Sequence, residues 1–177
     1  FNIKGELSPF MNTGIMVDGK VFTANTKSNY KGKRIFLKDI IQKGRIEKEF
    51  LINESDFHKW EYLKGSKKEK RISKTGYQYN YSEGGMVFPD SLDGPSRTII
   101  TGEGGPSPSR FKHVVKTKNG LRRLTPLELE RLNMFPDHHT KHKDVTNAKR
   151  AFFMGNALVV GVVEKIGMSL NAKLKNC

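Results

Sequence analysis

The 177-residue sequence contains a single cysteine, Cys177, which is its last residue. One cysteine excludes an intramolecular disulfide framework and is typical of a protein of the reducing cytoplasm. Cys177 follows no proline and lies in a polar tail, so it lacks the surroundings that activate a catalytic thiol. We therefore predict a cytoplasmic chain that carries no catalytic residue of its own.

Long apolar runs are also missing. No stretch approaches the ~20 residues that a membrane-spanning helix needs, and the most apolar helical pattern is interrupted by Gly161, Glu164 and Lys165. The first residues lack the hydrophobic segment of a signal peptide, and a start at Phe1 rather than Met suggests a truncated or cleaved chain. We expect no membrane partner.

Acidic residues are scarce relative to basic ones. The sequence has 18 Asp and Glu against 32 Lys and Arg, a net charge of +14, which favours a polyanionic partner and nucleic acid first. The densest basic segment is residues 64–74, where Glu69 is the single acid. Such a segment is either a solvated loop or a set of phosphate contacts. Under the second interpretation Lys67, Lys68 and Arg71 bind DNA.

Local patterns predict several short elements. Asp18-Gly19 between two β-rich runs, 15–17 and 20–23, favours a hairpin with a type I′ turn. Further strands are expected at 34–37 and 46–52, and the alternation of Tyr77, Tyr79 and Tyr81 is typical of one strand face. Short helices are expected at 38–42, and at 55–63 with Ser55 as its cap and Gly65 as its end.

Residues 83–110 are rich in glycine and proline. Gly102 to Gly105 lack the Lys-Ser or Lys-Thr of a nucleotide-binding loop, so close approach of the backbone to DNA is the better interpretation. Arg97 and Arg110 flank this segment and are suited to a guanine edge or to a phosphate. No metal site is predicted, because the histidines at 138, 139 and 142 have no cysteine nearby and lie in a Lys-rich setting.

Two helices are predicted near the C-terminus. The first has Thr125 as N-cap, Pro126 at its first position and Glu128 three residues after the cap, which is a capping box, and Pro136 ends its apolar pattern. The second follows Gly155-Asn156. Its apolar stripe consists of Leu158, Val162, Ile166 and Leu170.

Together these blocks resemble a known family. The pattern R-R-L-T-P-x-E-x-x-R-L-x-x-F-P-D at 122–137, followed by G-N-A-L-V-V-x-V-V-E-x-I at 155–166, resembles the last two motifs of DNA (cytosine-5)-methyltransferases. Upstream, Pro95-Ser96-Arg97-Thr98-Ile99-Ile100 is similar to the Thr-aliphatic signature near the end of that family's target-recognition region. The family's cofactor loop and its Pro-Cys nucleophile loop are absent from the sequence, which therefore resembles the C-terminal half of such an enzyme.

The resemblance implies an α+β fold: a small, mostly β target-recognition domain at 1–120, and helices at 121–177 that pack on an absent Rossmann-like catalytic domain. Thr98 and Ile99 would lie against DNA near the flipped nucleotide. Asn156, Ala157 and Leu158 would border the site of S-adenosylmethionine, although Leu158 departs from the valine common in the family. The residues expected to organise the recognition region are Arg123, Thr125, Glu128 and Arg131.

The implied function is DNA recognition within an enzyme that transfers a methyl group from S-adenosylmethionine to carbon 5 of a flipped cytosine in a restriction-modification system. The partners would be double-stranded DNA and a catalytic N-terminal half, on the same chain or in a separate subunit. Two alternatives remain: a DNA-binding subunit or module that never catalyses, and a basic RNA-binding protein, which leaves the match at 120–170 unexplained.

Overall fold

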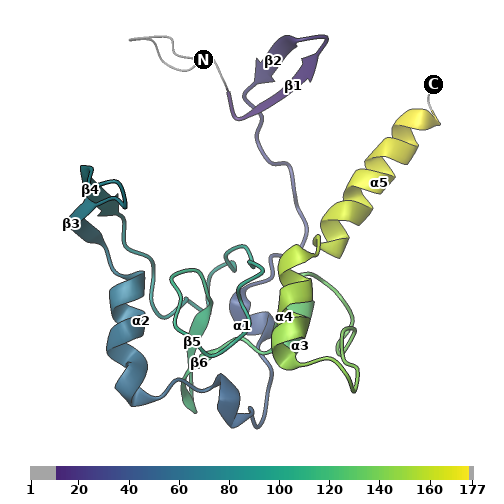
Figure 1. Cartoon of the computed structure of the whole chain (residues 1–177). Coiled ribbons are helices and arrows are strands. Elements are labelled where there is room, and N and C mark those ends of the chain that lie inside the picture. The colour runs from purple at the N-terminus through teal and green to yellow at the C-terminus, as the bar shows by residue number, and fades with distance from the viewer. Residues whose placement is uncertain (1–10, 176–177) are drawn as a thin grey trace. The chain divides into compact units, whose positions relative to one another are not determined.

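A computed structural model describes residues 11–175, and Cys177 and the first ten residues lie outside this range. The described chain divides into two compact units at the junction between Arg34 and Ile35 (Figure 1). The division predicted after residue 120 does not coincide with this junction. It falls inside a strand, residues 120–123, which pairs with residues 114–117. A functional boundary at 120 stays a prediction.

The first unit is the predicted hairpin. Strand β1 (Thr13–Val17) pairs antiparallel with β2 (Lys20–Ala24). Asp18 and Gly19 connect them with φ angles of 48° and 74°, which confirms the turn with two positive φ values.

The second unit contains the remaining elements. In order they are α1 (Leu37–Ile40), the 3₁₀ turns η1 (Lys48–Phe50) and η2 (Glu54–Asp56), α2 (Phe57–Lys64), β3 (Lys67–Ile72), β4 (Gln78–Glu83), β5 (Val114–Thr117), β6 (Gly120–Arg123), α3 (Pro126–Leu132), α4 (Asn147–Asn156) and α5 (Val160–Leu174). The described strands form three separate antiparallel pairs and no larger sheet. The predicted mixture of helices and strands is confirmed.

Two predicted strands are wrong. The stretch 34–37 instead leads into α1, because Asp39 accepts a hydrogen bond from the backbone N of Phe36 at 2.8 Å and caps the helix. Helical spacing then buries both Leu37 and Ile40. The stretch 46–52 contains η1 at its centre, and Leu51 alone makes a β-bridge, to Arg122.

The helix predicted at 55–63 exists with a different beginning. It is α2, which follows η2 directly and has Asp56 rather than Ser55 as its N-cap, while Gly65 ends it as predicted. The basic segment that follows is not a loop, since residues 67–72 form β3. Helix α4 was not predicted from the sequence.

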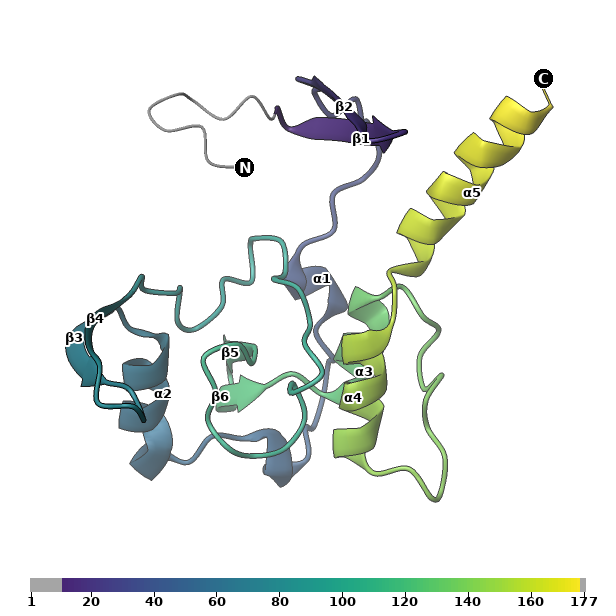
Figure 2. The same cartoon turned by 45° about the horizontal axis from the view of Figure 1, so that its top comes forward.

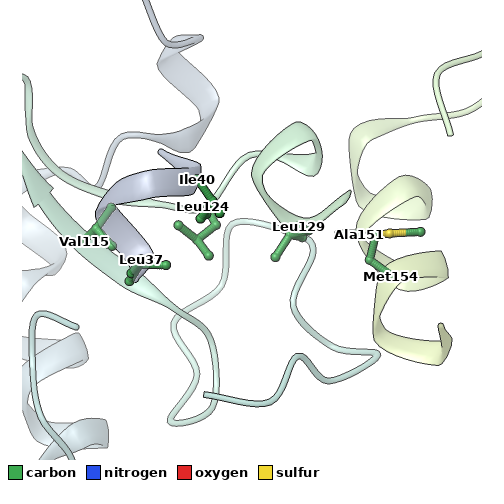
Figure 3. Packing of buried hydrophobic residues seen from close by; sticks show 7 residues of the cluster. All are labelled: Leu37, Ile40, Val115, Leu124, Leu129, Ala151 and Met154. Carbon is green, nitrogen blue, oxygen red and sulfur yellow. The ribbon is translucent and has the colours of Figure 1, made fainter. Parts of the chain in front are cut away.

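The apolar core lies among α1, β5, α3 and α4 (Figure 3). Figure 2 shows α3 and α4 side by side, and their contacts are the most extensive between any two of the described helices. The buried cluster consists of Leu37, Ile40, Val115, Leu124, Leu129, Ala151 and Met154.

A fully buried ion pair joins β6 to α3. Arg122 binds Glu128 with both guanidinium arms, at 2.8 Å and 2.6 Å. The Glu128 carboxylate also accepts from the backbone N of Thr125 and of Gln42, each at 2.8 Å. The capping box at Thr125 is thereby confirmed. Sequence reasoning named Glu128 but missed Arg122, although both belong to one motif.

The other arginines predicted to be architectural also bind within the unit. Arg123 donates to the carbonyl of Gly105 at 2.7 Å and to that of Glu49. Arg131 forms a two-armed pair with Asp137 and donates to the carbonyl of Ile40 at 3.1 Å. These contacts agree with an organising role for both residues.

Helix α3 ends earlier than its apolar pattern indicates. Its last residue is Leu132, and Met134 adopts a positive φ of 61°, so the chain has left the helix before Pro136. An ion pair of 2.8 Å between Glu130 and Arg150 then joins α3 to α4. No pattern in the sequence predicted this pair.

Helix α5 is almost entirely exposed. Gly161 is its one buried residue, whereas Val162, Ile166 and Leu170 are exposed. By length and composition alone, the stretch Asn147–Leu174 is long and apolar enough to cross a membrane. Our expectation that no stretch of the sequence approaches this length was therefore wrong. That criterion is weak for one helix, and here α4 and α5 are separated by three non-helical residues, 157–159.

We predict that Arg122→Lys lowers the free energy of unfolding by about 3–5 kcal/mol, because an ammonium cannot replace the two-armed contact and leaves Glu128 buried with an incomplete partner. Urea unfolding measures the change. The control is Arg45→Lys at an exposed position, with an expected change below about 0.5 kcal/mol. Equal stabilities of the two variants would contradict the assignment.

Candidate functional site

A groove in the second unit brings together two sets of predicted site residues. It has a volume of about 510 Å³. Thr98 and Ile99 line it, together with Ala157 and Leu158. Thr98 is exposed and Ile99 packs against the apolar core, while Leu158 is 73% exposed. The residues expected to face DNA and those expected to border the cofactor therefore share one cavity.

Asn156 stands beside this groove at the end of α4. Its side chain is exposed, and Nδ2 donates to the carbonyl of Phe152 at 2.9 Å. Asn133 holds the adjoining turn, since its Nδ2 donates to the carbonyl of Met154 at 2.8 Å and its carbonyl accepts from the N of Val160 at 3.0 Å. Sequence reasoning missed Asn133.

Two glycines permit close backbone approach, but to other parts of the protein. A Cβ at Gly155 would overlap the carbonyl of Ile100 and lie 2.5 Å from the Cα of Thr101. A Cβ at Gly104 would lie 2.8 Å from the carbonyl oxygen of Ala148 in α4. Helix α4 therefore explains the glycine at 104, and approach of the Gly102–Gly105 backbone to DNA stays a prediction.

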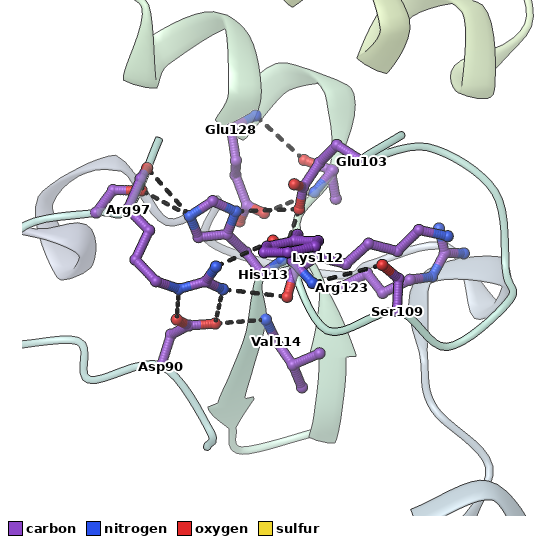
Figure 4. A network of polar contacts seen from close by, with 12 residues as sticks. Asp90, Arg97, Glu103, Ser109, Lys112, His113, Val114, Arg123 and Glu128 are labelled. Atoms are coloured by element: carbon purple, nitrogen blue, oxygen red, sulfur yellow. Dashed lines mark hydrogen bonds and ion pairs between the residues drawn. The ribbon is translucent and has the colours of Figure 1, made fainter. Parts of the chain in front are cut away.

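A polar network fixes the segment that carries Thr98 (Figure 4). Arg97 pairs with Asp90 at 2.8 Å and 3.1 Å and donates to the carbonyls of Phe111 and Lys112. Asp90 also accepts from the N of Val114 at 2.8 Å. Burial raises the pKa of the Asp90 carboxyl, but the hydrogen bonds from Arg97 and Val114 outweigh it and the pKa is lowered overall.

Buried His113 completes this network. Its Nδ1 lies 3.1 Å from Glu103, and its Nε2 lies 3.0 Å from the hydroxyl of Ser96 and 3.2 Å from the carbonyl of Arg97. These partners resemble a hydrolytic triad. However, the Ser96 hydroxyl donates its hydrogen to the carbonyl of Arg97 at 2.9 Å and not to the imidazole. These contacts position residues 96–97, and the Ser96 hydroxyl is not activated as a nucleophile.

Lys64 is buried next to the network and donates to the carbonyl of Lys112. Burial, followed by the charge of Arg97, lowers the pKa of the Lys64 ammonium to about 8. Because the pKa of Lys64 is lowered, its charged form at neutral pH reduces the free energy of unfolding of the protein.

The predicted DNA-contacting arginines have internal partners. Arg97 is held as described, and Arg110 pairs with Glu83 at 3.1 Å and donates to the carbonyls of Leu63, Gly65 and Gly84. These contacts give both guanidinium groups hydrogen-bond and ion-pair partners inside the protein, so neither group needs DNA as a partner. DNA contact by Arg97 or Arg110 stays an untested prediction that the geometry does not favour.

The three basic residues predicted on 64–74 differ in their surroundings. Lys67 is buried and pairs with Glu83 at 3.0 Å, and Arg71 pairs with Glu69 and lies over the ring of Tyr81 at 3.5 Å. Lys68 is exposed, and no hydrogen bond or ion pair engages its side chain within the described chain. Of these three, only Lys68 has no polar partner within the described chain.

The comparison with known proteins identifies the family of this chain. Residues 9–172 match the C-5 cytosine-specific DNA methylase family, and the chain belongs to that family.

A curated relative is the Type II methyltransferase M.Sau3AI of Staphylococcus aureus, 42% identical over 158 residues, which are 89% of this chain and 37% of the relative. Among solved structures, the S. pombe Dnmt2 methyltransferase is similar, with a TM-score of 0.57 and 17% identity over 89% of this chain and 51% of that one. This second likeness shows the fold alone. The chain thus spans only part of the length of both relatives.

We predict that Gly155→Ala destabilises the protein by about 1–3 kcal/mol, because the added methyl group must displace the backbone of residues 100–101 and with it the Thr98 wall of the groove. Gly167→Ala in α5 is the control, since nothing lies within 4 Å of its Cβ position. Urea unfolding and amide hydrogen exchange at 98–101 report both effects. Unchanged exchange in Gly155→Ala would refute the close packing.

We also predict that stability rises with pH through Lys64. The pKa of Lys64 is about 8 in the folded protein and about 10.4 when unfolded, so the unfolded chain binds more protons between these values. Between pH 7 and 9.5 this one group adds about 2 kcal/mol to the free energy of unfolding.

Lys64→Met removes that increment, while the carbonyl of Lys112 keeps its hydrogen bond from Arg97 at 3.1 Å. Urea unfolding of wild type and variant at the two pH values measures the difference. An identical pH dependence in both proteins would show that Lys64 stays charged.

Proposed function

We propose that this chain is the DNA-recognition part of a DNA (cytosine-5)-methyltransferase of a restriction-modification system in the cytoplasm, which methylates carbon 5 of a flipped cytosine in a specific duplex sequence. The observation that carries the proposal is the shared groove: Thr98 and Ile99 form one wall, and Ala157 and Leu158 another. Membership of the family and the 42% identity to a Type II methyltransferase support it.

The catalytic half of the enzyme lies elsewhere in this proposal. The one cysteine, Cys177, follows no proline, and the chain matches 37% of its curated relative. Helix α5 supplies the docking surface, because Val162, Ile166 and Leu170 form an exposed stripe. An exposed apolar stripe on a long helix is suited to burial against a Rossmann-like domain. Each such side chain contributes roughly 1.5–3 kcal/mol when buried.

S-adenosylmethionine would be held mainly by that other half, with residues 156–158 at its border. Asn156 is exposed and its Oδ1 has no hydrogen-bond partner in the described chain, while Leu158 offers an apolar wall. An amide acceptor and an apolar surface fit one edge of a polar, partly aliphatic cofactor. The cofactor supplies the methyl group when bound, and residues 156–158 of this chain would position one edge of it.

A DNA-binding subunit that never catalyses is the second candidate. The net charge of +14 supports it equally well, because that charge requires only a polyanionic partner. The two candidates differ in whether the chain completes a methyltransferase when its other half is supplied.

The test mixes this chain with the upstream half of its own enzyme and follows labelled methyl transfer from S-adenosylmethionine to duplex DNA. We predict no transfer by the chain alone and sequence-specific transfer by the mixture. Val162→Asp abolishes transfer in the mixture, because a carboxylate on the apolar stripe prevents docking.

Met168→Asp is the matched control, since Met168 is equally apolar and exposed but lies on the opposite side of α5. It should leave the mixture active. Methylation by the Val162→Asp mixture at the wild-type level would exclude α5 as the docking surface. No methylation by any mixture with the authentic upstream half would favour the subunit that never catalyses.

A further inference from the structure

The two faces of the β3–β4 hairpin are chemically different. The register pairs Lys68 with Ser82, Lys70 with Asn80, and Ile72 with Gln78, so these six residues share one face. We call it the outward face. The other face carries Lys67, Glu83, Glu69, Tyr81, Arg71 and Tyr79.

The second face of the hairpin packs against the rest of the unit. Tyr62 of α2 donates to Glu69 at 3.1 Å, and Lys67 lies 4.8 Å from the Tyr62 ring and donates to the carbonyl of Leu63. Glu83 pairs with Lys67 and with Arg110. These contacts hold the hairpin against α2 and turn the outward face away from it.

The outward face has no internal partners. All six of its residues are exposed, and no side-chain hydrogen bond or ion pair engages Lys68, Lys70, Gln78 or Asn80 within residues 11–175. Two positive charges therefore stand beside two amide groups, and the face contains no acid. Ile72 adds an apolar group that is 67% exposed.

This combination matches what a two-stranded ribbon needs in order to read DNA. The major groove admits such a ribbon, Asn and Gln pair with adenine edges through two hydrogen bonds, and apolar groups contact the thymine methyl. Lysines bind phosphates as point charges.

We infer that the outward face of β3–β4 enters the major groove, with Gln78 and Asn80 reading base edges, adenine first, and Lys68 and Lys70 binding phosphates. The inference rests on the proposed function, because it presumes that the chain binds duplex DNA. The prediction from sequence chose Lys67, Lys68 and Arg71. Of these, only Lys68 lies on the outward face, and Lys67 and Arg71 lie on the other face.

The experiment selects duplexes from a randomised library with the whole chain and sequences those retained. The wild type should enrich a preferred sequence. Asn80→Ala and Gln78→Ala should each lose about 5- to 150-fold of preference at one position, the equivalent of one paired base contact, and bind other duplexes as before.

A second variant removes the two lysines. Lys68→Gln with Lys70→Gln should weaken binding to all duplexes alike, and the slope of log affinity against log salt should fall by about 1.8, or about 0.9 per lost phosphate contact. The control is Lys118→Gln with Asn119→Ala in the β5–β6 turn, where the same residue types are also exposed. It should behave as wild type.

The outcomes separate the two proposals. If the wild type selects a sequence and all four outward-face substitutions leave selection and salt slope unchanged, the inference is overturned while DNA recognition stands. If the wild type does not bind duplexes, or binds single-stranded RNA more tightly, both are overturned. Circular dichroism and urea unfolding of each variant confirm that exposed substitutions leave the fold intact.

Discussion

The buried pair between Arg122 and Glu128 is the interaction on which the rest of the second unit depends. Two charges hidden from water are costly unless they are paired, and here two arms of Arg122 meet both oxygens of Glu128, although the Nε of Arg122 has no hydrogen-bond partner in the described chain. The same carboxylate caps α3 and receives the backbone N of Gln42, which follows α1. One side chain thus joins β6, α3 and the end of α1, and the apolar core is assembled around that junction.

The core in turn brings distant segments to one groove. Ile99, Ala157 and Leu132 pack at its edge, so the segment after Pro95 and the turn after α4 face the same cavity. The close contact of Gly155 with residues 100–101 fixes their separation. An arrangement of this kind suits a surface that must hold DNA and a neighbouring reaction site in register.

The excess of positive charge divides into two classes. Several cations are neutralised or buried for structural reasons, as at Arg97, Arg110 and Arg122. Others, such as Lys68 and Lys70, are exposed, and their side chains form no hydrogen bond or ion pair in the described chain. Net charge alone indicated a nucleic-acid partner but did not separate these classes, because the distinction depends on which carboxylates and carbonyls the fold places nearby.

The sequence by itself determined the features that have local causes. The Asp18-Gly19 turn, the capping box of Thr125 and Glu128, and the end of α2 at Gly65 follow from the conformations of a few adjacent residues, and the motif pattern indicated the family. Only the tertiary structure decided that 46–52 contains η1, that α4 exists, and that Arg122 rather than an exposed arginine binds Glu128. It also decided which face of β3–β4 is free, because strand register and the position of α2 are set by contacts between residues far apart in the chain.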